Sequence, residues 1–128
     1  MKANDNYVHM TEEQFEAFND LPVVGTFQML NLLKFKEKVE GSDMSGAKAY
    51  ALYMNAVLPF FQASGAKVVY QGRSQFTLIG PDDTEWDKVL IIEYASKQDF
   101  LKMITTEGYP AAMRSRALQD SRLILCKE

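Results

Sequence analysis

The chain has 128 residues, of which 47% are hydrophobic and 24% charged, the size and mix of one ordinary globular domain. Its 14 basic and 17 acidic side chains give a net charge of -3, so the clustered positive charge of a nucleic-acid-binding surface is not expected. One Cys excludes an internal disulfide and one His excludes a set of His ligands. We therefore expect no metal, no cofactor and no membrane span, and the lone thiol with no signal peptide predicts a cytoplasmic protein.

The first residues predict a loose arm and then a short helix. Residues 1–10 are polar and weakly periodic, so the predicted domain covers residues 11–128. Thr11-Glu12-Glu13-Gln14 has the pattern of a capping box, in which Thr11 accepts a backbone N–H and Gln14 returns a bond. Leu21-Pro22 is expected to end this helix.

A strand and the longest helix follow. Residues 23–35 predict a strand that is apolar on both alternating faces. Residues 46–63, capped by Ser45 or Ser42, carry apolar side chains at spacings of three and four, which indicates a helix with one apolar face. Pro59 inside this pattern predicts a kink or an early end.

The remaining segments predict strands and helices in the order strand, strand, helix, helix, strand. They are a strand at 67–72 that continues through a bend at Gly72 into 73–79, a strand at 86–94, a helix capped by Ser96 and ended by Gly108, a short helix at 109–118 and a strand at 121–127. Without the first helix the order is β-α-β-β-α-β, the ferredoxin-like pattern. We therefore predict an α+β fold, a four-stranded antiparallel sheet with helices on one face and an extra N-terminal helix.

The predicted sheet has more apolar surface than its own helices can cover. Two main helices cover one face, yet the strands are apolar on both, as in Leu30 and Leu32 against Met29 and Leu33. A monomer would leave several hundred Å² of apolar sheet in water, which soluble monomers rarely do. We expect a homodimer through the sheet face, with two sheets enclosing a barrel-like space, a dimeric α/β barrel.

Several segments between residues 23 and 125 together resemble the domain-of-unknown-function 1330 family. They are Met29 to Phe35, Tyr50 with Tyr53-Met54, Trp86 to Val89 with Glu93 to Ser96, Phe100 with Met103, Tyr109, and Arg116 to Leu118 with Asp120 to Ile124. The resemblance implies a dimeric α/β barrel of ferredoxin-like protomers and no particular activity. Its wider superfamily includes cofactor-free monooxygenases, haem-degrading enzymes and lactone isomerases, an analogy of fold only.

Asn31 and Arg73 are the first candidate site residues. Asn31 interrupts an apolar strand, where an amide is costly unless bonded. It either bonds a ligand or water inside the barrel or bonds a neighbouring loop. Arg73 follows the predicted bend at Gly72 and could hold a carboxylate or enolate oxygen, or it could face solvent or form an interface ion pair.

Four aromatic residues complete the candidate set. Tyr50 and Tyr53 lie at i, i+3 on one helix, where a phenol could donate to an oxyanion or simply pack. Trp86 could line a pocket edge, an interface or the core, and Tyr109 lies with Arg114 and Arg116 near the end of the chain. The only imidazole, His9, lies in the loose segment predicted at the N-terminus, and this position weakens the case for an acid–base mechanism.

These residues predict a small-molecule-binding protein or a cofactor-independent enzyme, of isomerase or monooxygenase type, that acts on a small organic acid. The catalytic candidates are Asn31, Tyr53 and Arg73, and Tyr50, Trp86 and Tyr109 join them as ligand-binding candidates. The alternative is a non-catalytic dimeric regulatory or stress module, which a completely filled interior would favour.

Overall fold

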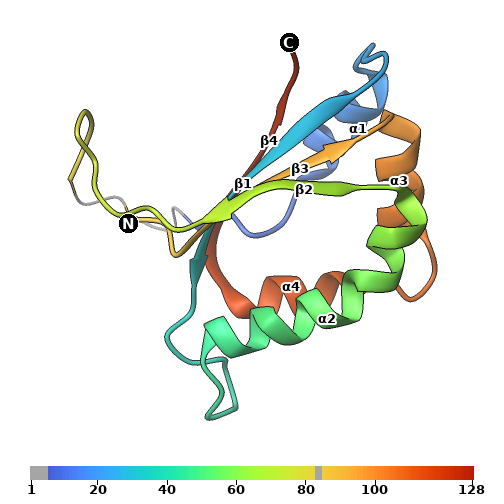
Figure 1. Ribbon diagram of the computed structural model, residues 1–128. Helices are drawn as coiled ribbons and strands as arrows, with labels where there is room; N and C mark the ends of the chain where they lie inside the picture. The colour runs from blue at the N-terminus through green and yellow to red at the C-terminus, as the bar shows by residue number, and fades with distance from the viewer. Residues whose placement is uncertain (1–5, 83–84) are drawn as a thin grey trace.

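The computed structural model describes residues 6–82 and 85–128, which form one sheet with helices on one side (Figure 1). In chain order the elements are α1 (Glu12–Asp20), β1 (Phe27–Phe35), α2 (Gly46–Ser64), β2 (Lys67–Gly72), β3 (Lys88–Tyr94), α3 (Lys97–Thr105), α4 (Ala111–Ala117) and β4 (Leu118–Cys126). The strands lie in the order β2-β3-β1-β4, and each neighbouring pair is antiparallel. The predicted α+β class and ferredoxin-like topology are confirmed, whereas the dimeric barrel stays a prediction.

The starts of the first two helices follow from side-chain caps. At α1 the Thr11 hydroxyl accepts the Gln14 N–H at 3.0 Å, and the Gln14 carboxamide accepts the Thr11 N–H at 3.2 Å, so the capping box is confirmed. Ser45 caps α2 by accepting the Lys48 N–H at 3.1 Å. The helix runs past Pro59 to Ser64, so an early end there is wrong. Phe60 and Phe61 pack on the core directly after the proline and hold the helix in place.

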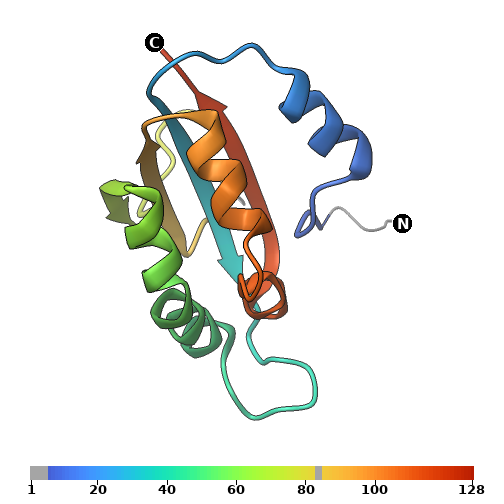
Figure 2. The ribbon, with the colours of Figure 1, turned by 90° about the vertical axis from the view of Figure 1, so that its right-hand side faces the viewer.

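The core lies between the sheet and the helices. Along β1, alternate residues are buried on the side that packs against the helices, and the first three of them pair with buried residues of β3. This set consists of Phe27, Met29, Asn31 and Leu33. Figure 2 shows α2, α3 and α4 in front of the sheet, with α1 to one side. No helix among residues 6–82 and 85–128 is long and apolar enough to cross a membrane.

One predicted strand is wrong. β2 ends at Gly72, and residues 73–79 pair with no strand of the described chain but project beyond the sheet (Figure 1). The register irregularity of β2 lies between Val68 and Tyr70 rather than at Gly72. We call residues 73–82 the arm. The sequence of the arm is strand-like, but a strand forms only where a neighbouring strand accepts a series of backbone hydrogen bonds, and among the described residues only the Ser74 N–H at the base of the arm has such a bond, to Trp86.

Two contacts attach the N-terminal part to the sheet and helices. The buried Lys97 ammonium donates to three carbonyls at the end of α1, those of Phe18 at 3.1 Å and of Asn19 and Leu21 at 2.6 Å. Further upstream, the Tyr7 N–H donates to Asp120 at 2.8 Å. Of the loose N-terminal segment predicted for residues 1–10, residues 1–5 lie outside the described residues. The predicted domain boundary at residue 11 stays a prediction.

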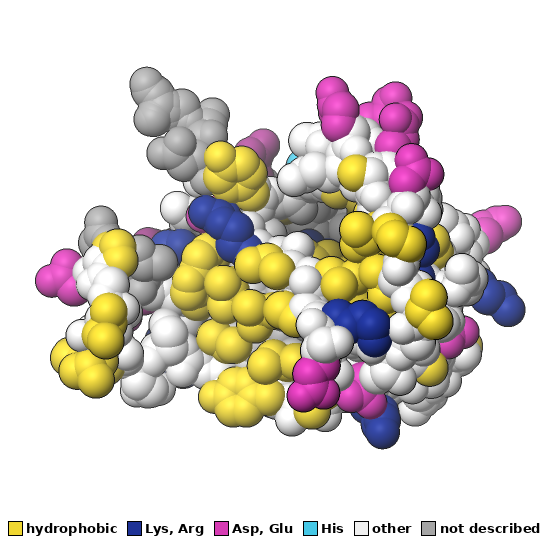
Figure 3. Space-filling model, turned by 90° about the horizontal axis from the view of Figure 1, so that it is seen from above, with side chains coloured by type: hydrophobic (Ala, Val, Ile, Leu, Met, Phe, Trp, Pro, Cys, Tyr) yellow, Lys and Arg dark blue, Asp and Glu magenta, His cyan; other side chains and the backbone are white. Residues whose placement is uncertain are grey.

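No helix of residues 6–82 and 85–128 lies over the other face of the sheet. Figure 3 looks onto this open face, where hydrophobic side chains gather over the strands. The cross-strand register places apolar residues of three strands on this face: Leu30, Leu32, Val89, Ile91 and Ile124. The first four are half-buried by their neighbours, and Ile124 is 45% exposed. The helices therefore cover only one face, as the sequence predicts.

Candidate functional site

Four tyrosines and one arginine lie between the sheet and the helices, and we call them the tyrosine–arginine cluster. Tyr50 and Tyr53 come from α2, Tyr94 from β3, Tyr109 from the α3–α4 connection and Arg114 from α4. Tyr50, Tyr53 and Tyr94 are buried, and Tyr109 is half-buried. The phenol oxygens of Tyr53 and Tyr109 lie 3.0 Å apart and share one hydrogen bond. The sequence thus brings a polar cluster into an otherwise apolar core.

Arg114 is the cationic member of this cluster. Its Nη2 atom is buried and has no hydrogen-bond partner among the described residues. A guanidinium remains charged at every physiological pH, and leaving one of its donors buried and unpaired costs free energy. The cluster therefore holds a positive charge with an unused donor.

Burial shifts the pKa values of three phenols in the cluster upwards. Burial raises the pKa of Tyr50, and the nearby Arg114 guanidinium opposes that shift. Burial, together with the neighbouring Tyr109, raises the pKa of Tyr53 and of Tyr94 well above the ordinary value for tyrosine. These phenols accordingly stay protonated around neutral pH and can donate hydrogen bonds.

Asn31 lies on the same side of the sheet as the cluster and is 5% exposed. Its Nδ2 atom is 3.4 Å from the Met29 carbonyl and 3.4 Å from the Leu90 carbonyl, both long contacts within the sheet. Asn31 shares the buried side of β1 with Phe27, Met29 and Leu33, and the sheet register shifts before Phe35. A loop partner for Asn31 is not observed, because its neighbours are strand carbonyls.

Two predicted site residues are not part of this group. Arg73 is exposed in the arm, because residues 73–79 do not continue the sheet. Trp86 packs its ring 5.4 Å from the Arg122 guanidinium, which also lies 4.7 Å from the Tyr7 ring. Arg122 pairs with Leu32 and so belongs to the open face. The structure gathers Tyr50, Tyr53 and Tyr109 near the helices but leaves Arg73 and Trp86 apart.

The sequence does contain a signal for Arg114. It precedes Ala117 by three residues on α4, and Ala117 is fully buried. Residues three apart on a helix share a face, so Arg114 lies on the buried side of α4.

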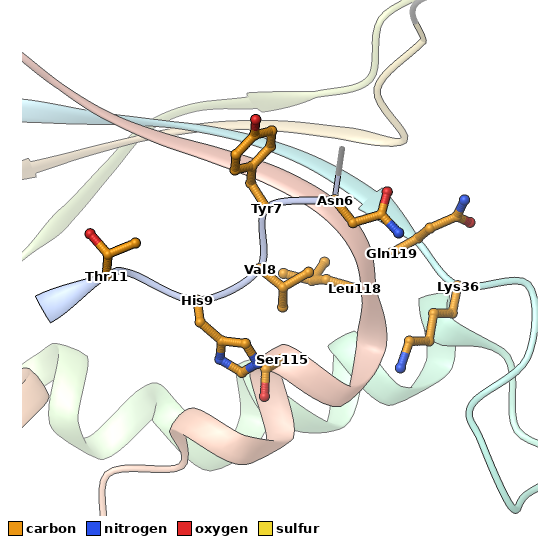
Figure 4. Close-up of a pocket in the computed structure, with 9 residues that line it drawn as sticks. All are labelled: Asn6, Tyr7, Val8, His9, Thr11, Lys36, Ser115, Leu118 and Gln119. Atoms are coloured by element: carbon orange, nitrogen blue, oxygen red, sulfur yellow. The ribbon is translucent and has the colours of Figure 1, made fainter. Parts of the chain in front are cut away.

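A separate hollow of about 470 Å³ opens between the N-terminal segment and α4 (Figure 4). Its lining consists of Asn6, Tyr7, Val8, His9, Thr11, Lys36, Ser115, Leu118 and Gln119. The His9 ring lies beside Ser115 in this view. No hydrogen bond to another described residue fixes the His9 imidazole, so this hollow offers a less ordered set of groups than the tyrosine–arginine cluster. Within the described part of the chain, no three His, Cys, Asp or Glu side chains come together as a metal site.

The strand order and the one-sided helices define a ferredoxin-like α+β protein. The same fold occurs in a dimeric ferredoxin-like protein of unknown function from Thermobifida fusca YX, with a TM-score of 0.51 and 10% identity. The match covers 82% of this chain and 92% of that one.

Two crystal structures of the RPA0582 protein, a protein of unknown function from Rhodopseudomonas palustris, are much more similar. Each is 38% identical to this chain over 96% of its length, and the matches cover 95% and 97% of the RPA0582 chains with TM-scores of 0.90 and 0.89. The chain therefore belongs to the family of the RPA0582 protein. No family model and no curated protein matches the chain. The resemblance to the domain-of-unknown-function 1330 family accordingly stays a prediction.

Proposed function

We propose that this protein binds a small organic anion at the tyrosine–arginine cluster. The observation that carries the proposal is the buried Nη2 donor of Arg114, which has no partner among the described residues. A carboxylate or enolate oxygen is the partner that a guanidinium prefers, because the hydrogen bond is charge-assisted and can be bidentate. The proposal keeps the predicted class of ligand and replaces Arg73 with Arg114 as its cationic partner.

The phenols extend this proposal to orientation and chemistry. Tyr53 and Tyr109 share a single hydrogen bond, so one of the two protons is available to a ligand oxygen. A phenol that donates to an oxygen as it gains negative charge stabilises an enolate or a related intermediate. A cofactor-independent isomerisation or oxygenation of an electron-rich organic acid is the enzymatic form of this proposal. Asn31, on the same side of the sheet, is proposed to help orient the ligand.

The first prediction tests the cationic partner. A thermal-shift screen against small aliphatic and aromatic carboxylates should raise the melting temperature of the wild-type protein with at least one class. Arg114→Met should weaken that binding at least about tenfold, because hydrogen bonds to charged groups contribute about 1.5–3 kcal/mol. Titration calorimetry measures the affinity of the same acid for each variant.

Arg116→Met is the matched control, because Arg116 lies on the same helix but is exposed. It should bind the acid as the wild type does. Circular dichroism of both variants checks that the fold is retained. Equal affinity of the Arg114→Met protein, or an equal loss in both variants, would show that the anion binds elsewhere.

The open face supports a second proposal, a homodimer through the sheet. Its apolar side chains are covered by no helix, and the Thermobifida fusca protein of the same fold is described as dimeric. Burying such a face against a second copy is the simplest way to remove it from water. A non-catalytic dimeric module is the alternative if no acid binds. Sedimentation equilibrium should give twice the 14.5 kDa mass of one chain at micromolar concentration.

A further inference from the structure

The arm exposes three large apolar side chains within four residues. Phe76 is 82% exposed, Leu78 is 84% exposed and Ile79 is 92% exposed. Isolated apolar residues are common on protein surfaces, but a contiguous group at the end of a projecting segment marks a contact site. These side chains touch little of their own chain, so they do not stabilise the fold of a single molecule.

The base of the arm is fixed. The Ser74 N–H donates to the Trp86 carbonyl at 3.1 Å, and the Trp86 N–H donates to the Ser74 hydroxyl at 2.8 Å. The Ser74 hydroxyl also donates to the Trp86 carbonyl at 3.1 Å. These bonds direct the arm away from its own sheet, so another molecule must cover its tip.

We propose that the arm packs against a second copy of this chain and extends the interface of the open face. This inference rests on the proposed dimer and names the segment that completes it. A twofold axis through the two open faces places both arms in one self-complementary interface, each reaching over the partner. The apolar tip of the arm then lies along the apolar surface of the other protomer.

The area of the open face supports this role. Four strands about 4.8 Å apart and on average about eight residues long present a plane of roughly 500 Å². A stable interface buries about 800 Å² on each partner. The sheet alone is therefore too small, and the arm supplies the additional apolar surface on the same side of the molecule, where Figure 3 shows it beside the hydrophobic patch.

The charges and the contacts at the base favour a second copy over other partners. The arm carries one cation, Arg73, at its beginning and one anion, Asp82, at its end, and a second copy presents the same two opposite charges. One cation and one anion give no net attraction to an acidic lipid surface. Tyr7, Arg122 and Trp86 stack at the base of the arm, and these three residue types are enriched where interfaces bind most tightly.

The test compares a pair of exposed apolar residues in the arm with a single exposed apolar residue elsewhere. Phe76→Ser with Ile79→Ser changes only the arm and should raise the dimer dissociation constant at least about 100-fold, because each dimer loses four contact side chains. Val24→Ser is the matched control, since Val24 is also 82% exposed but lies in the connection between α1 and β1. It should leave the dissociation constant unchanged. Sedimentation equilibrium measures the constant for each protein.

The two proposals can fail separately. A wild-type dimer whose dissociation constant the arm variant does not change overturns the arm but leaves the dimer through the open face. A wild-type protein that stays monomeric overturns both. The substitutions affect side chains that lie almost entirely in solvent. Melting temperatures that match the wild-type monomer therefore confirm that a change in dissociation constant does not come from misfolding.

Discussion

Asp120 on β4 accepts three hydrogen bonds, one of which joins the N-terminal segment to the sheet. Its Oδ1 atom accepts the Tyr7 N–H and an Arg122 N–H at 2.8 Å and the Ser121 N–H at 2.9 Å. Partial burial alone would raise the pKa of Asp120, but the Tyr7, Arg122 and Ser121 bonds outweigh it, and the pKa lies below its usual range. These bonds favour the ionised carboxylate in the folded protein.

This shift predicts a pH dependence of stability. Because the folded-state pKa of Asp120 is depressed, its contribution is present above the unfolded pKa of about 3.9 and is lost as the pH falls through the folded value. Asp120→Asn should therefore reduce the free energy of unfolding at pH 6, and the difference from the wild type should shrink between pH 4 and pH 2.5. Urea unfolding at each pH measures it. A difference that grows on acidification would contradict the assignment.

Single residues of the site could be predicted in part. The helical spacing of Tyr50 and Tyr53 placed both on the buried face of α2, where the structure has them. The sequence predicts Arg73 at a bend within the sheet, but its segment pairs with no strand of the described residues. Helical spacing shows that Arg114 shares a face with Ala117, but the sequence does not show how deeply α4 packs against the tyrosines, so Arg114 is absent from the predicted site.

At the scale of elements, Gly46 lies where β1, α2 and α4 meet. The Gly46 N–H donates to the Lys36 carbonyl at 2.9 Å, and the Lys36 N–H donates to the Ala117 carbonyl at 2.9 Å. A Cβ atom at Gly46 would overlap these backbone atoms of Lys36 and Ala117. Backbone cannot move aside as the end of a side chain can, so only glycine fits this junction.

Gly46→Ala should lower the free energy of unfolding by about 2–3 kcal/mol, because overpacking in a close-packed region costs about that amount. Gly65→Ala is the comparison. Gly65 ends α2 with a φ of 74°, but nothing lies within 4 Å of an added Cβ, so it should lose only about 1 kcal/mol. Chemical denaturation measures both variants, and an equal loss in the two would disprove a steric role for Gly46.

The elements that the sequence predicted well are those with long apolar patterns or clear caps. β1, β3 and α2 were found within a few residues of their ends, and Thr11 and Ser45 cap as expected. The arm was not found, because residues 73–79 have the composition of a strand but no partner in their own chain. The composition of a segment shows how well its residues suit a strand. A strand also needs a neighbouring strand, which comes from elsewhere in the sequence.

At the scale of the whole molecule, the sequence predicts an uncovered sheet face because its helices are too few to cover both faces, and the structure has this open face.

A charged substitution tests whether a second copy covers the open face. Ile124→Glu places a carboxylate on the open face and should convert the dimer to a monomer. Leu58→Glu is the control, because Leu58 is 50% exposed on α2, which covers the opposite face. Light scattering after gel filtration measures both masses, and a dimeric Ile124→Glu protein would place the interface elsewhere.

The central position of β1 has a consequence for how the protein is made. Its two neighbours, β3 and β4, are both translated later, and Phe35 pairs with Leu118 at the end of that register. At about 5–20 residues per second, a ribosome needs roughly 4–16 s to reach the second neighbour. During this interval the nascent chain holds an apolar strand with a free hydrogen-bonding edge, the species that chaperones shield. Slow codons between β1 and β4 would lengthen that exposure, so heterologous expression should depend on translation speed.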